Sequence, residues 1–392
     1  MPTILYLVHD LSDPAVARRV TMLEAGGARV QTAGFCRAEV PERIGSSRPI
    51  MLGATADGDF RQRLAMVATA ALRLRRMLGD VSRPDVIVAR TLEMLALARR
   101  ATGFYRPRPA LVYESLDIHR LLLGEGLKSR AMRAVERALV SDAALLMTSS
   151  PAFVREYFEP RQGMTLPTLL LENKVLDLGG GTVPPGAELP CPPSGKPWTI
   201  GWFGALRCRQ SLDILSRLTR MAEGRIEVVL RGRPALREFD DFHGRVANEP
   251  FIRFEGPYRN PDDLAAIYGE VHFAWAIDYF EAGLNSDWLL PNRLYESCLH
   301  GVVPIALSAT ETGRTLARRD IGIRVDAATP EALLAALPLT DESYAVERAR
   351  VTARPRSFWV CGPSECTALV ARLAALPGEA RPKGRAMMEA AS

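Results

Sequence analysis

The sequence of 392 residues lacks closely spaced cysteines. Its six cysteines are scattered along the chain, and no two of them form a Cys-x-x-Cys pair. Zinc sites and redox-active disulfides need thiols at short spacing, so the sequence favours neither, and we expect no metal site of this kind. We expect free thiols in a reducing cytoplasm. The six residues are Cys36, Cys191, Cys208, Cys298, Cys361 and Cys366.

Long apolar runs are also missing. No run approaches the ~18 residues that a membrane-crossing helix needs. The N-terminal residues 1–3 lack the basic region of a signal peptide, and no cleavage site follows the apolar run at 4–8. We therefore expect a buried strand there, in a cytoplasmic protein that is soluble or bound peripherally to a membrane.

A strong charge excess is absent as well. Lys and Arg number 50 against 45 for Asp and Glu, which gives a net charge of +5. This excess is too modest for a dedicated nucleic-acid-binding protein, so we expect no nucleic-acid partner. The whole excess lies in the first 190 residues, which carry 25 basic and 20 acidic side chains.

The first half of the chain shows a strand–helix–strand pattern. The strand at 4–8 ends before His9-Asp10, Asp13-Pro14 begins a helix, and Gly26-Gly27 ends it. A second strand follows at 29–33, which completes the βαβ unit of a parallel sheet covered by helices on both faces. Further strands are predicted at 86–89, 110–113 and 145–148.

The second half repeats this pattern after a segment rich in proline and glycine. Residues 178–197 have the composition of a hinge. Strands are predicted after it at 198–203, 226–230, 252–254, 271–277 and 302–306. The sequence therefore predicts an N-terminal α/β domain (1–177), the hinge (178–197), a C-terminal α/β domain with a terminal helix (198–376), and a flexible tail (377–392). Such sheets place ligands at the carboxyl ends of their strands.

A phosphate-binding helix is predicted in the C-terminal domain. Pro291-Asn292-Arg293 looks like a helix start, and the free N–H groups there suit a diphosphate. Glu296 lies three residues after Arg293, on the same helix face, where a carboxylate can accept hydrogen bonds from a ribose. The alternative is an ordinary surface helix with an Arg/Glu pair.

This segment, Pro291-Asn292-Arg293-Leu294-Tyr295-Glu296 followed by Gly301 and a buried strand, resembles the donor-nucleotide signature of GT-B glycosyltransferases. The likeness is greatest to bacterial family 4-like enzymes that build surface polysaccharides. It implies two tandem Rossmann-like domains with a cleft between them. It also implies that Glu296 holds the donor ribose and that Asn292 and Arg293 lie beside the diphosphate.

Three further segments resemble the same family in the same order. Residues 201–207 are similar to its first nucleotide-domain strand, where Gly204 would let the backbone approach the phosphates and Arg207 would pair with them. Arg231 would reach the diphosphate from the next strand. Residues 254–258 resemble the loop that meets the nucleobase.

One departure from the family concerns the donor sugar. Many members carry two glutamates separated by seven residues, and the first contacts the sugar. Trp288 stands at that position here, and the nearest acids are Asp287 and Glu281. We name Asn285 as a substitute sugar contact.

The acceptor side is predicted at 112–119, a strand that runs into a polar loop. Glu114, Asp117 and His119 are the candidates for contacting the acceptor hydroxyl. An inverting reaction needs one carboxylate as general base, whereas in a retaining reaction the leaving diphosphate can take the proton. The resemblance implies retention. His9-Asp10 replaces the glycine-rich turn usual after the first strand.

A basic amphipathic helix is predicted in the first domain. Leu64, Val67, Ala71, Leu74 and Leu78 form one apolar stripe. Such a helix either packs on a core or lies on an anionic membrane. Its arginines are Arg61, Arg63, Arg73, Arg75 and Arg76.

Together, these features predict a hexosyltransferase that moves a sugar from a nucleotide-sugar, taken as a UDP-sugar, to a lipid-linked or oligosaccharide acceptor in surface polysaccharide synthesis. It would act at the inner leaflet, without a cofactor and without a metal, because Arg207, Arg231 and Arg293 can neutralise the diphosphate. The alternatives are a non-hydrolysing sugar-nucleotide epimerase and an inactive nucleotide- or glycan-binding paralogue.

Overall fold

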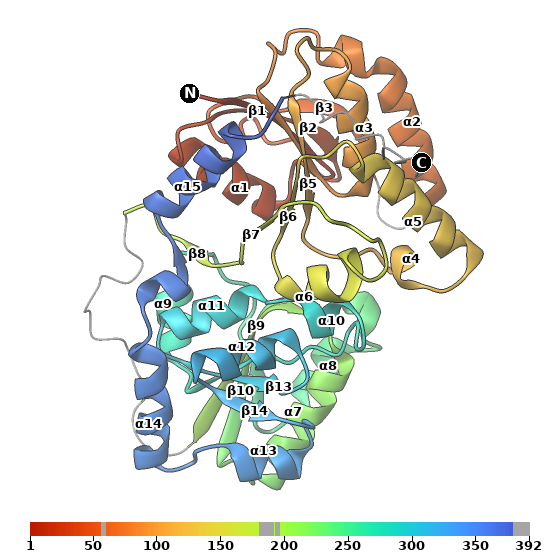
Figure 1. Ribbon diagram of the computed structural model, residues 1–392. Helices are drawn as coiled ribbons and strands as arrows, with labels where there is room; N and C mark the ends of the chain where they lie inside the picture. Colours follow the sequence, from red (N-terminus) through yellow and green to blue (C-terminus); the bar gives the residue numbers. More distant parts are fainter. Residues whose placement is uncertain (56–59, 180–191, 193–196, 379–392) are drawn as a thin grey trace, which may run out of the picture. The chain divides into compact units, whose positions relative to one another are not determined.

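The computed structural model describes residues 1–55, 60–179, 192 and 197–378, and for residues 60–64 only the backbone. They form two compact units (Figure 1). The first consists of Met1–Thr148, Gln162–Leu169 and the residues from Pro363 onward, and the second of Ser149–Arg161 and Leu170–Gly362. The predicted α/β architecture of two Rossmann-like domains is confirmed.

The first unit is built on a seven-stranded sheet in the order β3-β2-β1-β4-β5-β6-β7, with parallel pairing from β3 to β6. The strands are β1 (Thr3–Val8), β2 (Arg29–Cys36), β3 (Ile50–Ala54), β4 (Val86–Arg90), β5 (Ala110–Ser115), β6 (Leu145–Thr148) and β7 (Thr168–Leu170). The helices are α1 (Pro14–Ala25), α2 (Phe60–Met77), α3 (Leu92–Thr102), α4 (Arg120–Leu123), α5 (Leu127–Val140) and α15 (Pro363–Ala374).

The opening βαβ unit forms for the reasons that the sequence indicates. The Asp13 side chain accepts a hydrogen bond from Ala15 N at 2.9 Å, and Pro14 occupies the first helical position of α1. The N–H of Gly26 then bonds back to Met22 O, which ends the helix before β2. The predicted limits of the helix are confirmed, whereas β2 extends to Cys36, beyond its predicted end at residue 33.

The second unit contains a six-stranded parallel sheet in the order β11-β10-β9-β12-β13-β14. Its strands are β9 (Trp198–Leu206), β10 (Ile226–Pro234), β11 (Ile252–Phe254), β12 (Phe273–Trp275), β13 (Val303–Leu307) and β14 (Ile323–Val325), and β8 (Val175–Leu176) pairs with β15 (Val360–Cys361). In both sheets the strand order reverses at the first strand, β1 or β9, which is where such folds bind ligands.

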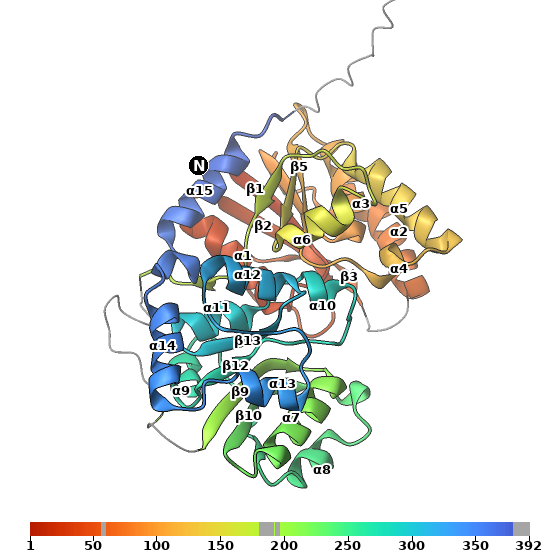
Figure 2. The ribbon, with the colours of Figure 1, turned by 60° about the horizontal axis from the view of Figure 1, so that its bottom comes forward.

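Helices cover both faces of this second sheet (Figure 2). Trp202 packs into one hydrophobic cluster with Leu215 of α7, while the next residue, Phe203, packs into another with Leu264 of α9. Successive side chains of a strand point to opposite faces, so β9 is buried on both sides. The helices are α6 (Pro151–Phe153), the π-helix η1 (Val154–Phe158), α7 (Arg209–Met221), the 3-10 helix η2 (Leu236–Glu238), α8 (Phe242–Ala247), α9 (Leu264–Gly269), α10 (Asn285–Trp288), α11 (Asn292–Leu299), α12 (Glu311–Arg319), α13 (Pro330–Ala336), α14 (Asp341–Thr352) and the 3-10 helix η3 (Arg356–Phe358).

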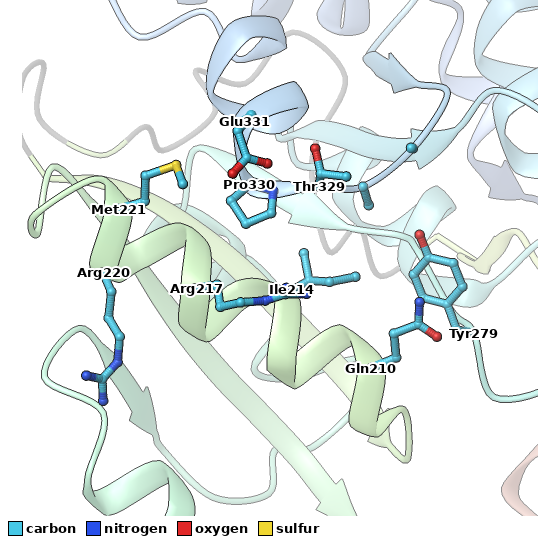
Figure 3. A pocket seen from close by; sticks show the side chains of 11 residues that line it. Gln210, Ile214, Arg217, Arg220, Met221, Tyr279, Thr329, Pro330 and Glu331 are labelled. Carbon is cyan, nitrogen blue, oxygen red and sulfur yellow. The ribbon is translucent and has the colours of Figure 1, made fainter.

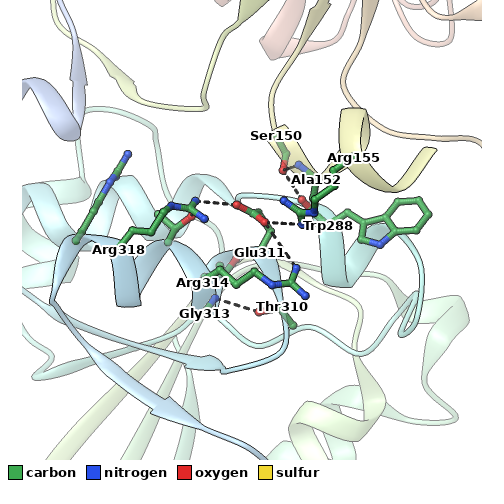
Figure 4. Close-up of polar contacts among 12 residues, drawn as sticks. Ser150, Ala152, Arg155, Trp288, Thr310, Glu311, Gly313, Arg314 and Arg318 are labelled. Carbon is green, nitrogen blue, oxygen red and sulfur yellow. Dashed lines mark hydrogen bonds and ion pairs between the residues drawn. The ribbon is translucent and has the colours of Figure 1, made fainter. Parts of the chain in front are cut away.

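The sequence predicts one boundary between the domains, at residues 178–197, whereas each of the two observed units combines separate segments of the chain. Residues 149–161 belong to the second unit because they are bonded to it (Figure 4). Ser150 Oγ donates a hydrogen bond to the Trp288 carbonyl, and Arg155 pairs at 3.0 Å with the fully buried carboxylate of Glu311, which also meets Arg314 and Arg318. Residues 180–191 and 193–196 of the predicted hinge lie outside the described residues, as does most of the predicted tail.

The terminal helix α15 belongs to the first unit and packs against α1 rather than completing the second domain. The contact is close at Gly26, directly after α1. A Cβ atom built on Gly26 would lie 2.1 Å from the Cys366 carbonyl oxygen of α15. Only glycine allows the two helices to meet at this distance.

Replacing Gly26 with alanine tests this packing. We expect Gly26→Ala to lower the free energy of unfolding by about 1–3 kcal/mol, because the new methyl group forces α15 away from α1. Urea unfolding followed by circular dichroism measures the change. The matched control is Gly126→Ala, where a Cβ meets nothing within 4 Å. Equal stability of the two variants would contradict the close contact.

Candidate functional site

Two glycines end the central strands of the second unit. Gly204 on β9 has φ +109° and Gly232 on β10 has φ +132°, values that favour glycine. A Cβ on Gly232 would lie 1.9 Å from the Gly204 carbonyl oxygen, so the two backbones are in direct contact. A Cβ on Gly204 would meet nothing within 4 Å, which leaves the backbone there open to a ligand.

Two of the predicted phosphate-binding arginines stand at the ends of the same two strands. Arg207, directly after β9, donates to Asp278 at 3.1 Å, and its guanidinium lies 4.7 Å from the centre of the Phe280 ring. Arg231 on β10 pairs with Glu270 at 3.2 Å. Each of these two side chains is held in place by one acid, which also balances its charge.

Arg293 is the third of these arginines. It lies in the first turn of α11, and burial lowers the pKa of its guanidinium below the usual value. Asp278 opposes this effect and Arg207 adds to it. The Nε atom is buried and has no hydrogen-bond partner among the residues that the structure describes. A buried cation without a partner is costly, so this position suits an anionic ligand.

Glu296 follows on the next turn of α11 and is 5% exposed. Its carboxylate accepts hydrogen bonds from Asn260 Nδ2 at 2.7 Å and from Tyr268 Oη at 3.2 Å. Asn260 lies just beyond the loop predicted to meet the nucleobase, and the Gly256 carbonyl of that loop accepts from Gly232 N at 2.9 Å. The structure thus brings the predicted ribose contact, base loop and phosphate-binding strand together.

Trp288, at the position of the missing glutamate, packs into the protein and is 8% exposed. Its ring meets Phe153 edge-on, with centroids 6.5 Å apart. Asn285, the proposed substitute, is buried at the start of α10 and donates to Glu281 at 2.6 Å. Burial raises the pKa of Asp287, which accepts from Gly283 N. The sugar contact therefore remains a prediction.

A cavity of about 610 Å³ lies in the first unit. Polar residues line it from the ends of β1, β4 and β5, including His9, Arg90 and Glu114, and Asp117 and His119 reach it from the following loop. Helices α2, α3, α4 and α5 supply its apolar wall. The predicted acceptor residues thus share one cavity.

Among these residues Glu114 is fully buried, and each of its carboxylate oxygens accepts a hydrogen bond. Oε1 accepts from Arg19 Nε at 2.8 Å, and Oε2 accepts from the hydroxyl of Tyr6. Burial alone would raise the pKa of Glu114, but Arg19 and Arg90 outweigh it and hold the pKa below its usual value. Glu114 therefore positions Arg90 at the cavity, and of the three predicted acceptor contacts Asp117 and His119 are the accessible ones.

Both accessible residues belong to the turn before α4. Asp117 is exposed, and its carbonyl accepts from Ser115 Oγ at 3.0 Å. The Nδ1 atom of His119 accepts from Leu121 N at 3.2 Å as the cap of α4, which leaves Nε2 as the outward donor.

The sequence analysis did not name Arg90 and Thr91, although they lie at the carboxyl end of β4, where parallel sheets place their ligands. Thr91 precedes α3 without capping it, and its buried Oγ1 has no partner among the described residues. His9 Nδ1 is also buried without a partner among the described residues. Burial lowers the pKa of His9, and the positive charge of Arg90 lowers it further. These groups leave unused hydrogen-bonding capacity at the cavity.

A second cavity, of about 550 Å³, lies between α7 and α13 and is lined by Ile214, Arg217, Met221 and Pro330 among others (Figure 3). None of the residues predicted to hold the donor lines it. In the part of the chain that the structure describes, no three His, Cys, Asp or Glu residues are grouped as metal ligands. No described helix is long and apolar enough to cross a membrane.

Residues 14–168 match the glycosyl transferase 4-like domain. Over 96% of its length the chain is 56% identical to the succinoglycan biosynthesis protein ExoL of Rhizobium meliloti (strain 1021), covering 94% of that protein. The chain belongs to the family 4-like glycosyltransferases. The predicted family and enzyme class are thereby confirmed.

Solved structures share the fold of this glycosyltransferase. Anabaena HepE in complex with UDP and glucose superposes with a TM-score of 0.67 at 15% identity, covering 96% of this chain and 100% of that one. Sucrose-phosphate synthase from Thermosynechococcus elongatus gives a TM-score of 0.67 at 13% identity, covering 95% and 98%. These likenesses confirm the GT-B architecture.

Glu296 offers a direct test of the donor site. We expect Glu296→Ala to weaken binding of the preferred nucleoside diphosphate, among UDP, GDP and dTDP, by at least about tenfold, since hydrogen bonds to a charged group contribute about 1.5–3 kcal/mol. Isothermal titration calorimetry measures the affinity. The control is Glu238→Ala, an exposed acid of η2. Unchanged affinity in a folded Glu296→Ala variant would remove Glu296 from the site.

Proposed function

We propose that this glycosyltransferase moves a hexosyl group from a nucleotide-sugar, a UDP-sugar in the first instance, to a lipid-linked saccharide during assembly of a succinoglycan-type exopolysaccharide. The observation that carries the donor part is the half-buried Arg293, whose buried Nε has no partner among the described residues, one helical turn from Glu296. The name of the Rhizobium relative supports the polysaccharide, and the complex of HepE with UDP supports the donor class.

The proposed reaction is retaining. The bond from the sugar anomeric carbon to the diphosphate oxygen breaks, a bond to the acceptor oxygen forms on the same face, and the hydroxyl proton passes to the leaving diphosphate. Arg207, Arg231 and Arg293 stabilise the charge that develops on that diphosphate. Asp117 and His119 orient the acceptor hydroxyl. Three fixed cations supply what a divalent ion would, so we propose that no metal is needed.

Release of nucleoside diphosphate tests the proposal. We expect the purified enzyme to release UDP from one UDP-sugar of a panel of UDP-, GDP- and dTDP-sugars when a lipid-linked saccharide is present, and to keep this rate in EDTA because the arginines carry the charge. Chromatography of the products measures both. Conversion of the sugar without release would favour an epimerase, and binding without turnover an inactive paralogue. Loss of the rate in EDTA would refute metal independence.

We further propose that the enzyme works at the anionic inner surface of the plasma membrane. Leu74 of α2 and Leu78, directly after that helix, belong to the predicted stripe and pack into the core. On the same helix Leu72 is 80% exposed, and Arg73, Arg75 and Arg76 are exposed. The side chains of Arg61, Arg63 and Leu64 lie outside the described part of the chain. Exposed arginines beside an exposed leucine suit a lipid surface.

Helix α5 supports the same proposal and was missed in the sequence. Its buried face is largely polar: Arg133 donates to the carbonyls of Leu122 and Gly124, and Glu136 accepts from Tyr113. Its exposed face carries apolar and basic residues, among them Leu127 at 82% exposure and Val135 at 49%. The neighbouring Lys128 and Arg130 are exposed and have no carboxylate partner among the described residues.

Vesicle binding tests whether this surface, and not the net positive charge of the protein as a whole, binds the membrane. We expect Leu127→Ser/Lys128→Gln to weaken binding to phosphatidylglycerol-containing vesicles about tenfold, since each basic residue contributes about 1 kcal/mol and the leucine adds burial. Sedimentation at two salt concentrations measures it. The matched control, Leu236→Ser/Arg237→Gln, removes an exposed leucine and its basic neighbour from the second unit. An equal loss of vesicle binding in the two double variants, or no preference for anionic over neutral vesicles, would refute the proposal.

A further inference from the structure

The cavity of the first unit has two kinds of wall, and they come from different elements. The ends of the strands and their loops supply polar groups of both signs: His9, Arg37, Arg90, Asp13 and Asp117 are among them. The helices supply the apolar wall, which consists of Val67, Leu92, Ala96, Leu122, Met132, Val135 and Leu139. Apart from Glu93 of α3 and Leu116 of the loop after β5, the polar groups therefore gather at the sheet and the apolar groups at the helices.

Helix α5 presents its apolar stripe to this cavity. Met132, Val135 and Leu139 lie three and four residues apart, the spacing of one helix face. In most globular proteins such a stripe packs into the core, but here Val140 is the only apolar residue of α5 that is buried, beside the polar Ser129, Arg133 and Glu136. Met132 and Leu139 are only half-buried, so the stripe remains available to an apolar ligand.

Val135 connects the cavity to the outer surface. It lines the cavity and is also 49% exposed, on the same helix as the exposed Leu127, Lys128 and Arg130. The apolar wall thus continues to the face proposed to meet the membrane. A lipid chain bound along this wall would lie on apolar side chains from the cavity to that face.

The strand ends suit the other end of such a molecule. His9 Nδ1 and Thr91 Oγ1 are buried without partners among the described residues, and the outward Nε2 of His119 is a donor. Sugar hydroxyl groups both donate and accept hydrogen bonds, so a saccharide can satisfy these atoms. A wall with charges of both signs favours a polyhydroxyl group over a strongly charged one.

We propose that this cavity holds the acceptor across the junction between its sugar and its lipid. The terminal sugar lies at the ends of β1, β4 and β5, and the first segment of the lipid chain lies against Met132, Val135 and Leu139 of α5. This inference rests on the proposed function, because it names the part of the lipid-linked acceptor that the enzyme recognises. The lipid chain of the acceptor, and not only its saccharide, then determines which acceptor binds.

Alkyl glucosides of increasing chain length test the inference with the whole enzyme and no donor. Methyl, butyl and octyl β-D-glucoside, each below its aggregation concentration, are titrated by calorimetry. We expect the affinity to rise with chain length, by up to about fourfold for each added methylene. An affinity that does not depend on chain length, or no measurable binding of the octyl compound, would overturn the proposal.

A double variant and a control variant test whether the alkyl chain binds in this cavity. We expect Met132→Gln/Val135→Asn to remove at least half of the chain-length dependence while leaving methyl glucoside binding unchanged. The control Val346→Asn alters a valine of α14 that is 53% exposed and should match the wild type. The same dependence in all three proteins would overturn the proposal. Binding of UDP, measured in parallel by calorimetry, reports on the proposed donor site separately, because it requires no acceptor.

Discussion

The unpaired charge of Arg293 is the constraint on which the donor site depends. The side chain is half-buried at the start of α11, with its Nε atom fully buried, and the helix amides there add positive character. The described part of the chain places no carboxylate within ion-pair distance of it. The arrangement is costly in an empty protein and favourable once an anion is present. Arg207 and Arg231 differ, because Asp278 and Glu270 hold them.

The rest of the second unit serves to keep this position accessible. Gly204 and Gly232 bring β9 and β10 into contact and leave the backbone at the end of β9 uncovered. Asn260 and Tyr268 hold Glu296 in place one turn beyond Arg293. The segment at 149–161 is held by the Trp288 carbonyl, which accepts from Ser150, by the Trp288 ring, which contacts Phe153, and by Glu311, which pairs with Arg155.

Much of this architecture follows from the sequence, because its determinants are local. Asp13-Pro14 and Gly26 fix the limits of α1, and Pro291 precedes α11 as expected. The partners of the site residues could not be predicted in this way. Tyr268 and Asn260 lie 28 and 36 residues from Glu296, and only the packed sheet brings them together. Glu114 illustrates the same limit, since its role depends on Tyr6 and Arg19 in distant elements.

Burial patterns mark a second limit of the sequence. Both α2 and α5 carry apolar residues at helical spacing, but the pattern alone does not show that three of the four buried residues of α5 are polar. Residues 149–161 and α15 could not be assigned to a unit from composition, since a single hydrogen bond, an ion pair and the close approach at Gly26 decide their places. In each case long-range contacts outweigh local pattern.

Hydrogen–deuterium exchange in the presence and absence of UDP tests the donor site most directly. Amide exchange slows where a ligand removes local opening. We expect UDP to protect residues 201–207, 230–232 and 291–296 and to leave the peptides of α7 and α13 unchanged. Protection confined to α7 and α13, or none at saturating UDP, would contradict a donor site built around Arg293 and Glu296.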